Sequence, residues 1–176
     1  LREISVIELP SAEQVELAAT RLVDALAAER EIGDRTSELD DRRRSLLEQA
    51  LHFAEAAGED VPCPICEQGT LDGAWRTRAA NLLAESDLLD QHRRAVRTGL
   101  DQARRKAVGL IAAPPKVLGQ GIVQLESQAQ AARAWMAWGS LPADDRALVE
   151  HFRSSYQALL SAVATWKNDA ASAEAQ

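Results

Sequence analysis

Apolar residues recur every seven positions along two long stretches of the chain, one before and one after Pro64. The members of the two repeats are Ala18, Ala25, Ile32, Leu39, Leu46 and Phe53, then Trp75, Leu82, Leu89, Val96, Ala103 and Leu110. Each member of the first repeat lies as far from position 64 as a member of the second, so the repeats are mirror images. A seven-residue apolar repeat keeps one face of a helix against a partner helix. The pattern therefore predicts a long antiparallel coiled-coil hairpin over residues 11–111.

The first helix of this hairpin has recognisable end signals. Ser11 and Gln14 have the spacing of a capping box, so the helix is expected to begin there and to run to about residue 57. Gly33 costs the helix about 1 kcal/mol relative to Ala, which allows a local bend near residues 33–36.

The apex of the hairpin is expected at residues 58–73. Gly58 is suited to the C-terminal cap of the first helix, and Asp72 to the N-cap of the second, which should run to about residue 111. Residues 1–10 form a lead-in segment, read either as a short strand or as extended chain.

Two shorter helices are predicted in residues 112–176, over about 122–138 and 143–173. The expected apolar face of the first consists of Ile122, Leu125, Ala129, Ala132 and Met136. That of the second consists of Phe152, Leu159, Trp166 and Ala173, with Leu148, Tyr156 and Val163 beside them. We expect this pair of helices to pack on the base of the hairpin as a three- or four-helix bundle, with Trp135, Trp138 and Trp166 in its core.

Composition and charge agree with an all-α fold. The chain is rich in Ala, Leu, Glu, Arg and Gln and has few aromatic residues, which favours long helices. A net charge of -7 argues against a segment that mainly grips nucleic acid. The sequence shows no membrane-spanning run and no signal peptide, so we expect a cytoplasmic protein without membrane contact. Because the chain starts at Leu1 without a methionine, it is expected to be a segment of a larger protein.

The only two cysteines of the chain, Cys63 and Cys66, lie at the predicted apex. Two thiolates in this spacing can hold one side of a zinc ion, but a structural zinc takes four ligands in a tetrahedron. On the hairpin arrangement, the histidines His52, His92 and His151 are poorly placed to complete the site. The simplest completion is a second copy of the chain, which predicts a twofold-symmetric homodimer with one Zn²⁺ per dimer.

The apex Cys63-Pro64-Ile65-Cys66 between mirrored helical arms resembles the zinc hook of SMC-like ATPases of DNA double-strand-break repair, the SbcC type. The resemblance covers roughly residues 46–89. It implies that Cys63 and Cys66 are zinc ligands and that Pro64 and Ile65 shape the loop so that backbone N–H groups face the sulfurs. Glu67 departs from the pattern, because glycine often follows the second cysteine of a hook directly.

This resemblance also implies a function, namely zinc-mediated tethering of two copies of an ATPase of DNA repair or maintenance. DNA and a nuclease subunit would then be partners of the parent protein and not of this segment. The chain contains no G-x-x-x-x-G-K-[ST] phosphate-binding loop, so this segment is not expected to hydrolyse ATP.

Two other functions remain open. The cysteines could form a thiol redox switch at a helical hairpin tip, although the βαβ setting of such dithiols is missing. Alternatively, the chain could be a helical adaptor that binds a partner protein through its base bundle, with incidental cysteines.

For several individual residues the sequence allows two interpretations of their role. Trp75 could bind a partner, but it fits the apolar seam opposite Phe53 better. Glu59 and Asp60 are read as a polar loop rather than as catalytic carboxylates. Solvated faces with i,i+4 ion pairs are favoured over DNA contacts for Arg42, Arg43 and Arg44, and for Arg104, Arg105 and Lys106.

Overall fold

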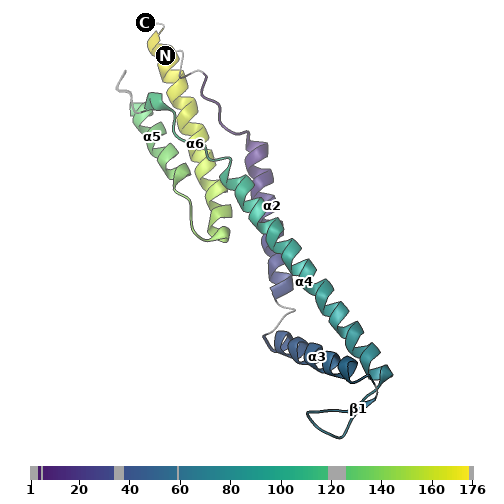
Figure 1. Ribbon diagram of the computed structural model, residues 1–176. Helices are drawn as coiled ribbons and strands as arrows, with labels where there is room; N and C mark the ends of the chain where they lie inside the picture. Colours follow the sequence, from purple (N-terminus) through teal and green to yellow (C-terminus); the bar gives the residue numbers. More distant parts are fainter. Residues whose placement is uncertain (1–3, 5, 34–37, 59, 119–125, 175–176) are drawn as a thin grey trace. The chain divides into compact units, whose positions relative to one another are not determined.

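A computed structural model describes residue 4 and residues 6–33, 38–58, 60–118 and 126–174 (Figure 1). This part of the chain is mostly helical, as the sequence predicts. Its helices are α2 (Ala12–Gly33), α3 (Glu38–Ala57), α4 (Gly73–Val108), η1 (Lys116–Leu118, a 3₁₀ helix), α5 (Glu126–Gly139) and α6 (Asp145–Glu174). Two short strands, β1 (Val61–Pro62) and β2 (Thr70–Leu71), lie between α3 and α4. No helix within the described ranges is both long and apolar enough to cross a membrane.

The chain divides into two compact units, each with its own packing. The first, here called the bundle unit, comprises Leu1–Ala27 and Gly99–Gln176. The second, the tip unit, comprises Ala28–Thr98 and contains α3, the strands and most of α4.

The predicted capping box is confirmed at the start of α2. The backbone N–H of Gln14 donates to Oγ of Ser11 over 3.1 Å, and the backbone N–H of Ser11 donates to Oε1 of Gln14 over 2.8 Å. The first arm, expected as one helix to residue 57, is described as two helices, because α2 ends at Gly33 and α3 begins at Glu38. A glycine at the end of α2 is consistent with its poor helix propensity. The expected bend at 33–36 falls largely on residues 34–37, outside the described residues.

The bundle unit has one hydrophobic core, to which α2, α4, α5 and α6 all contribute. The largest fully buried side chains in this core are Trp138, Trp166, Phe152, Leu22, Leu148 and Leu159. The apolar stripe expected on α6 is confirmed except at Ala173, which is exposed. Trp135, Trp138 and Trp166 are all buried, so their expected place in the core is also confirmed.

The apolar face predicted for α5 is wrong. Met136 is 73% exposed and Ala129 is exposed, whereas the buried face carries Ser127, Ala131, Trp135 and Trp138. The two indole rings bury more apolar surface than a methionine and several alanines, so they determine which side of α5 faces the core. Ile122 and Leu125, from the same predicted face, lie outside the described residues.

The lead-in segment is held on the bundle unit by its own backbone carbonyls. The hydroxyl of Tyr156 donates to the carbonyl of Pro10, and Nζ of Lys167 donates to the carbonyl of Ile7 over 2.7 Å. Ile4 is buried in the bundle core. Residues 7–10 have no regular secondary structure, which agrees with the extended reading of this segment.

Two adjacent leucines of α6 test the bundle core. Leu159 is 0% exposed and Leu160 is 39% exposed. We expect Leu159→Ala to lower the free energy of unfolding by about 2–5 kcal/mol, because it leaves a cavity. Leu160→Ala should cost no more than about 1 kcal/mol, since its side chain is already largely in water. Denaturant unfolding followed by the fluorescence of the buried tryptophans measures both, and equal losses would contradict this core.

Candidate metal centre

The loop that carries the two cysteines is closed by a short antiparallel ribbon. Val61 pairs with Leu71 and Pro62 pairs with Thr70, so β1 and β2 bring the two ends of residues 63–69 together. Leu71 is buried, which anchors one side of the ribbon in the tip unit.

Both helix ends beside this loop follow their predicted caps. Gly58 has a φ of +72°, a left-handed conformation that glycine adopts without a steric cost, and it ends α3. At the start of α4, the backbone N–H of Trp75 donates to Oδ1 of Asp72 over 2.7 Å. Sequence-local chemistry therefore determines where the helices stop and the cysteine loop begins.

Inside the loop, the backbone folds back on itself around Cys63. The N–H of Cys63 donates to the carbonyl of Gly69 over 2.6 Å, and the N–H of Glu67 donates to the carbonyl of Cys63 over 2.8 Å. Glu67 has a φ of 55°, the left-handed conformation that would be easiest for a glycine. The glycine missing directly after Cys66 thus corresponds to a position where the backbone does need a positive φ.

The two thiols lie close together, and backbone donors surround one of them. Cys66 accepts hydrogen bonds from the backbone N–H groups of Gln68 and Gly69 and has a hydrogen bond with the Cys63 side chain. These interactions lower the pKa of the Cys66 thiol below its ordinary value, because each of them favours the thiolate. Both cysteines are free; Cys66 is exposed and Cys63 is half-buried.

The donor set fits half of a structural zinc site. Zinc prefers thiolate ligands, and two thiols in one tight loop supply two corners of a tetrahedron. Within the described ranges, no group of three or more His, Cys, Asp and Glu side chains gathers to hold a metal. His52 and His92 are exposed, and His151 of the bundle unit bonds through Nε2 to the carbonyl of Trp138 over 2.9 Å. Among the described residues, the two thiols are therefore the only side chains that gather at this site.

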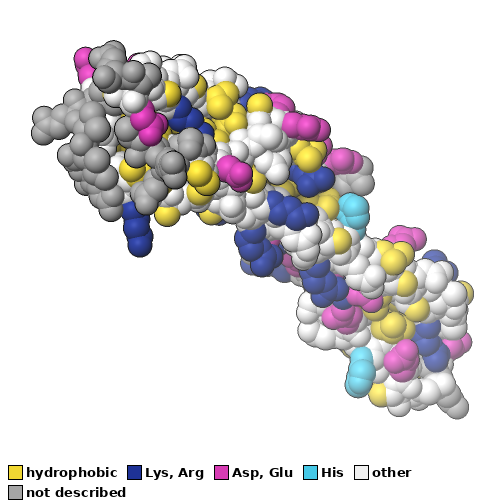
Figure 2. Space-filling model, turned by 90° about the horizontal axis from the view of Figure 1, so that it is seen from above, with side chains coloured by type: hydrophobic (Ala, Val, Ile, Leu, Met, Phe, Trp, Pro, Cys, Tyr) yellow, Lys and Arg dark blue, Asp and Glu magenta, His cyan; other side chains and the backbone are white. Residues whose placement is uncertain are grey.

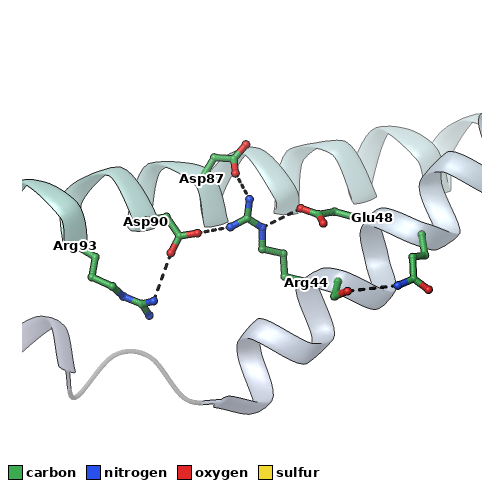
Figure 3. Close-up of polar contacts among 7 residues, drawn as sticks. Arg44, Glu48, Asp87, Asp90 and Arg93 are labelled. Carbon is green, nitrogen blue, oxygen red and sulfur yellow. Dashed lines mark hydrogen bonds and ion pairs between the residues drawn. The ribbon is translucent and has the colours of Figure 1, made fainter.

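Apart from this loop, α3 and α4 are linked through Arg44 (Figure 3). Its guanidinium forms ion pairs with Asp87 and Asp90 of α4 and with Glu48 of α3, the last over 3.0 Å. Asp90 in turn contacts Arg93 over 3.5 Å. Burial opposes the charge on Arg44, but the hydrogen bond to Glu48 and the neighbouring carboxylates outweigh it and raise its pKa.

The Arg44 contacts include one pair of an expected kind and two pairs that the sequence analysis did not predict. The i,i+4 pair with Glu48 is the kind of contact expected for this arginine run. The reach to Asp87 and Asp90 was not predicted. A signal for it exists in the sequence, since folding about residue 64 places Arg44 opposite position 84, less than two helical turns from Asp87 and Asp90.

The structure corrects the expectation that large apolar side chains line the seam between the arms. Leu46, Phe53 and Leu82 are exposed, and Trp75 is only half-buried. The buried residues of α3 and α4 in the tip unit are instead the small side chains Ala54 and Ala79. In this arrangement Arg44 reaches the two aspartates, and the larger apolar side chains lie outside the contact between the helices.

Members of the same seven-residue repeat are buried or half-buried in the bundle unit. There Ala18 and Ala103 are buried in the core, and Ala25 and Leu110 pack against it. The side chain of Leu39 lies outside the described residues.

The remaining charged residues form mixed surfaces. Arg104 pairs with Asp145 over 3.3 Å, and Asp60 pairs with Arg76 over 3.3 Å, while Glu59 lies outside the described residues. Lys and Arg side chains are interspersed with Asp and Glu on the face seen in Figure 2. These contacts agree with paired, solvated charge.

Comparison with protein-family models, curated protein sequences and solved structures found no match for this chain.

Removing Arg44 tests the link between the arms. We expect Arg44→Met to speed amide hydrogen exchange in α3, because Glu48, Asp87 and Asp90 then lose their shared cation. Arg43→Met is the matched control, since Arg43 is exposed and adjacent on the same helix. Exchange measured by mass spectrometry should separate the two variants. Identical protection of α3 in Arg44→Met and wild type would contradict a stabilising role.

The environment of Cys66 predicts its reactivity in metal-free protein. Because its pKa is lowered, the rate of alkylation by iodoacetamide should rise at a lower pH than for the same cysteine in an unfolded peptide of identical sequence. Cys63→Ala removes the neighbouring thiol and its hydrogen bond, so the rise should move toward higher pH. Peptide mass spectrometry across a pH series measures both. A rise at or above that of the unfolded peptide would show that the backbone donors do not stabilise the thiolate.

Proposed function

We propose that this chain is a zinc-mediated dimerisation module, in which Cys63 and Cys66 from two copies share one Zn²⁺. The observation that carries the proposal is the loop itself, where two free thiols lie together and backbone N–H groups stabilise a thiolate on Cys66. The full sequence has only two cysteines, so one copy supplies two of the four ligands that a structural zinc requires.

The residues of the chain have separate tasks in this proposal. When bound, the zinc would supply four metal–thiolate bonds that cross from one copy to the other. Cys63 and Cys66 provide the thiolates, and the N–H groups of Gln68 and Gly69 orient and stabilise that of Cys66. The β1–β2 ribbon and the two helix caps hold the loop in shape before the metal arrives.

The wider role follows from the resemblance to the zinc hook. The arms on either side of the loop would belong to an antiparallel coiled-coil hairpin of an SMC-like ATPase of DNA repair or maintenance. The module would tether two such hairpins, while ATP hydrolysis and any contact with DNA or a nuclease subunit belong to other parts of the parent. The repeat is mirrored about the apex in the sequence, and its members Ala18 and Ala103 share the bundle core, which supports this arrangement.

A redox pair is the second candidate, and the exposed, low-pKa thiol of Cys66 favours it. In this reaction the Cys66 thiolate attacks an external disulfide and releases one external thiol. The Cys63 thiolate then attacks the Cys66 sulfur of the mixed disulfide and releases the second external thiol. A Cys63–Cys66 bond forms, the external disulfide is reduced to two thiols, and two electrons leave the chain.

The mass of the protein in solution tests the proposal. Light scattering with zinc should give a dimer containing one zinc per two chains, and a strong chelator should return it to the monomer. Cys63→Ser/Cys66→Ser should stay monomeric in zinc, because the bridging ligands are gone.

Other results would assign the cysteines differently. A monomer in all three samples at high protein concentration would contradict the zinc bridge and favour the redox pair, whose disulfide would then show a measurable reduction potential. A dimer that ignores both zinc and the cysteine substitutions would place the interface elsewhere and favour a helical adaptor.

A further inference from the structure

Large apolar side chains lie on the surface of the tip unit beside the cysteine loop. Leu46 and Phe53 of α3 are 56% and 45% exposed, and Leu82 of α4 is 55% exposed. Trp75 and Leu89, which continue the same seven-residue spacing on α4, are half-buried. We call these five residues the apolar flank.

Helix geometry places all five residues on the same side of the two arms. Successive residues turn by about 100° in a helix. On α3, Leu46 and Phe53 therefore lie roughly 80–100° to one side of the buried Ala54. On α4, the other three residues lie roughly 40–80° to the same rotational side of the buried Ala79, and because the arms run in opposite directions this is the same flank.

The opposite flank is charged. It carries Arg44 and Glu48 of α3 and Asp87 of α4, which are joined by ion pairs (Figure 3). The rotation of the helices that brings these charged residues together leaves the apolar flank in water. The tip unit is thus amphipathic across its arms. One flank carries charged side chains that are paired with one another, and the other carries apolar side chains exposed to water.

We infer that a second copy of this chain covers the apolar flank, so that the arms as well as the cysteine loops meet in the dimer. The choice of a second copy as the occupant rests on the proposed function, because the half-filled metal site already requires one. In a twofold-symmetric dimer the same patch serves both partners, so an apolar surface is self-complementary where a charged one of single sign is not.

The size of a loop-to-loop contact supports this inference. Stable protein interfaces bury about 800 Å² on each partner, which two seven-residue loops around one metal do not provide. Ile65, which stands between the cysteines, is 75% exposed, so the loop itself also presents an apolar side chain. The seven-residue spacing of the flank is also that of a helix that packs along a partner helix.

Two leucines of α4 give a matched pair for the test. Leu82 belongs to the apolar flank, whereas Leu88 is 65% exposed on a different side of the same helix. In sedimentation measurements with zinc, Leu82→Ser should raise the dimer dissociation constant about tenfold or more, because each dimer loses two buried side chains. Phe53→Ser should do the same, and Leu88→Ser should leave the constant within about twofold of wild type. Circular dichroism checks that every variant keeps its helices.

The outcomes separate this inference from the proposed function. A zinc dimer that Leu82→Ser and Phe53→Ser leave unchanged would overturn the arm contact and leave the zinc bridge intact. A dimer that persists in chelator but is weakened by Leu82→Ser would support the arm contact and overturn the zinc bridge. A monomer in every sample would overturn both.

Discussion

The arrangement of the tip unit depends on one arginine held between three carboxylates. Arg44 has ion pairs with Glu48 on its own helix and with Asp87 and Asp90 on the other arm. An arginine can satisfy several carboxylates at once because its guanidinium presents five donors in a fixed plane. Since these contacts require particular faces of α3 and α4 to meet, they also determine which side chains remain outside. With these faces together, Leu46, Phe53 and Leu82 are left exposed.

The two units of the chain are stabilised by different interactions. In the bundle unit, indole and aliphatic side chains from four helices share one core, and Trp138 packs edge-on against Phe152 with ring centroids 5.2 Å apart. Its stability comes mainly from buried apolar area. In the tip unit the buried side chains of α3 and of the α4 portion are small, and ion pairs and loop hydrogen bonds carry more of the specificity. A partner that covered the exposed apolar surface of such a unit would add to its stability.

The cysteine loop gains its chemistry from backbone geometry. The N–H groups that face Cys66 belong to Gln68 and Gly69, and the left-handed turn at Glu67 accompanies the reversal of the chain that places them there. A thiolate stabilised in this way is suited both to a metal and to thiol exchange, because both reactions use the deprotonated sulfur. The geometry within one copy therefore favours Cys63 and Cys66 as the reactive groups. A structural zinc would need four ligands, two of them from elsewhere, whereas thiol exchange needs only these two cysteines.

Local sequence determined most of the secondary structure and the position of the cysteine loop between two capped helices. The apolar stripe of α6 is buried as the sequence predicts except at Ala173. The capping box at Ser11 and Gln14 and the caps at Gly58 and Asp72 stand where the sequence places them. These features depend on residues within one or two turns of each other, so no knowledge of the rest of the chain is needed to predict them.

Tertiary structure decided which face of a helix is buried where two faces compete. On α5 the pair Trp135 and Trp138 displaced Met136 from the core, and in the tip unit Arg44 favoured a face lined by alanines over one lined by leucines. A seven-residue repeat shows that a helix has an apolar face, but the partner that covers it is chosen by the total free energy of all contacts. That sum includes ion pairs between residues more than forty positions apart, which periodicity along the sequence does not reveal.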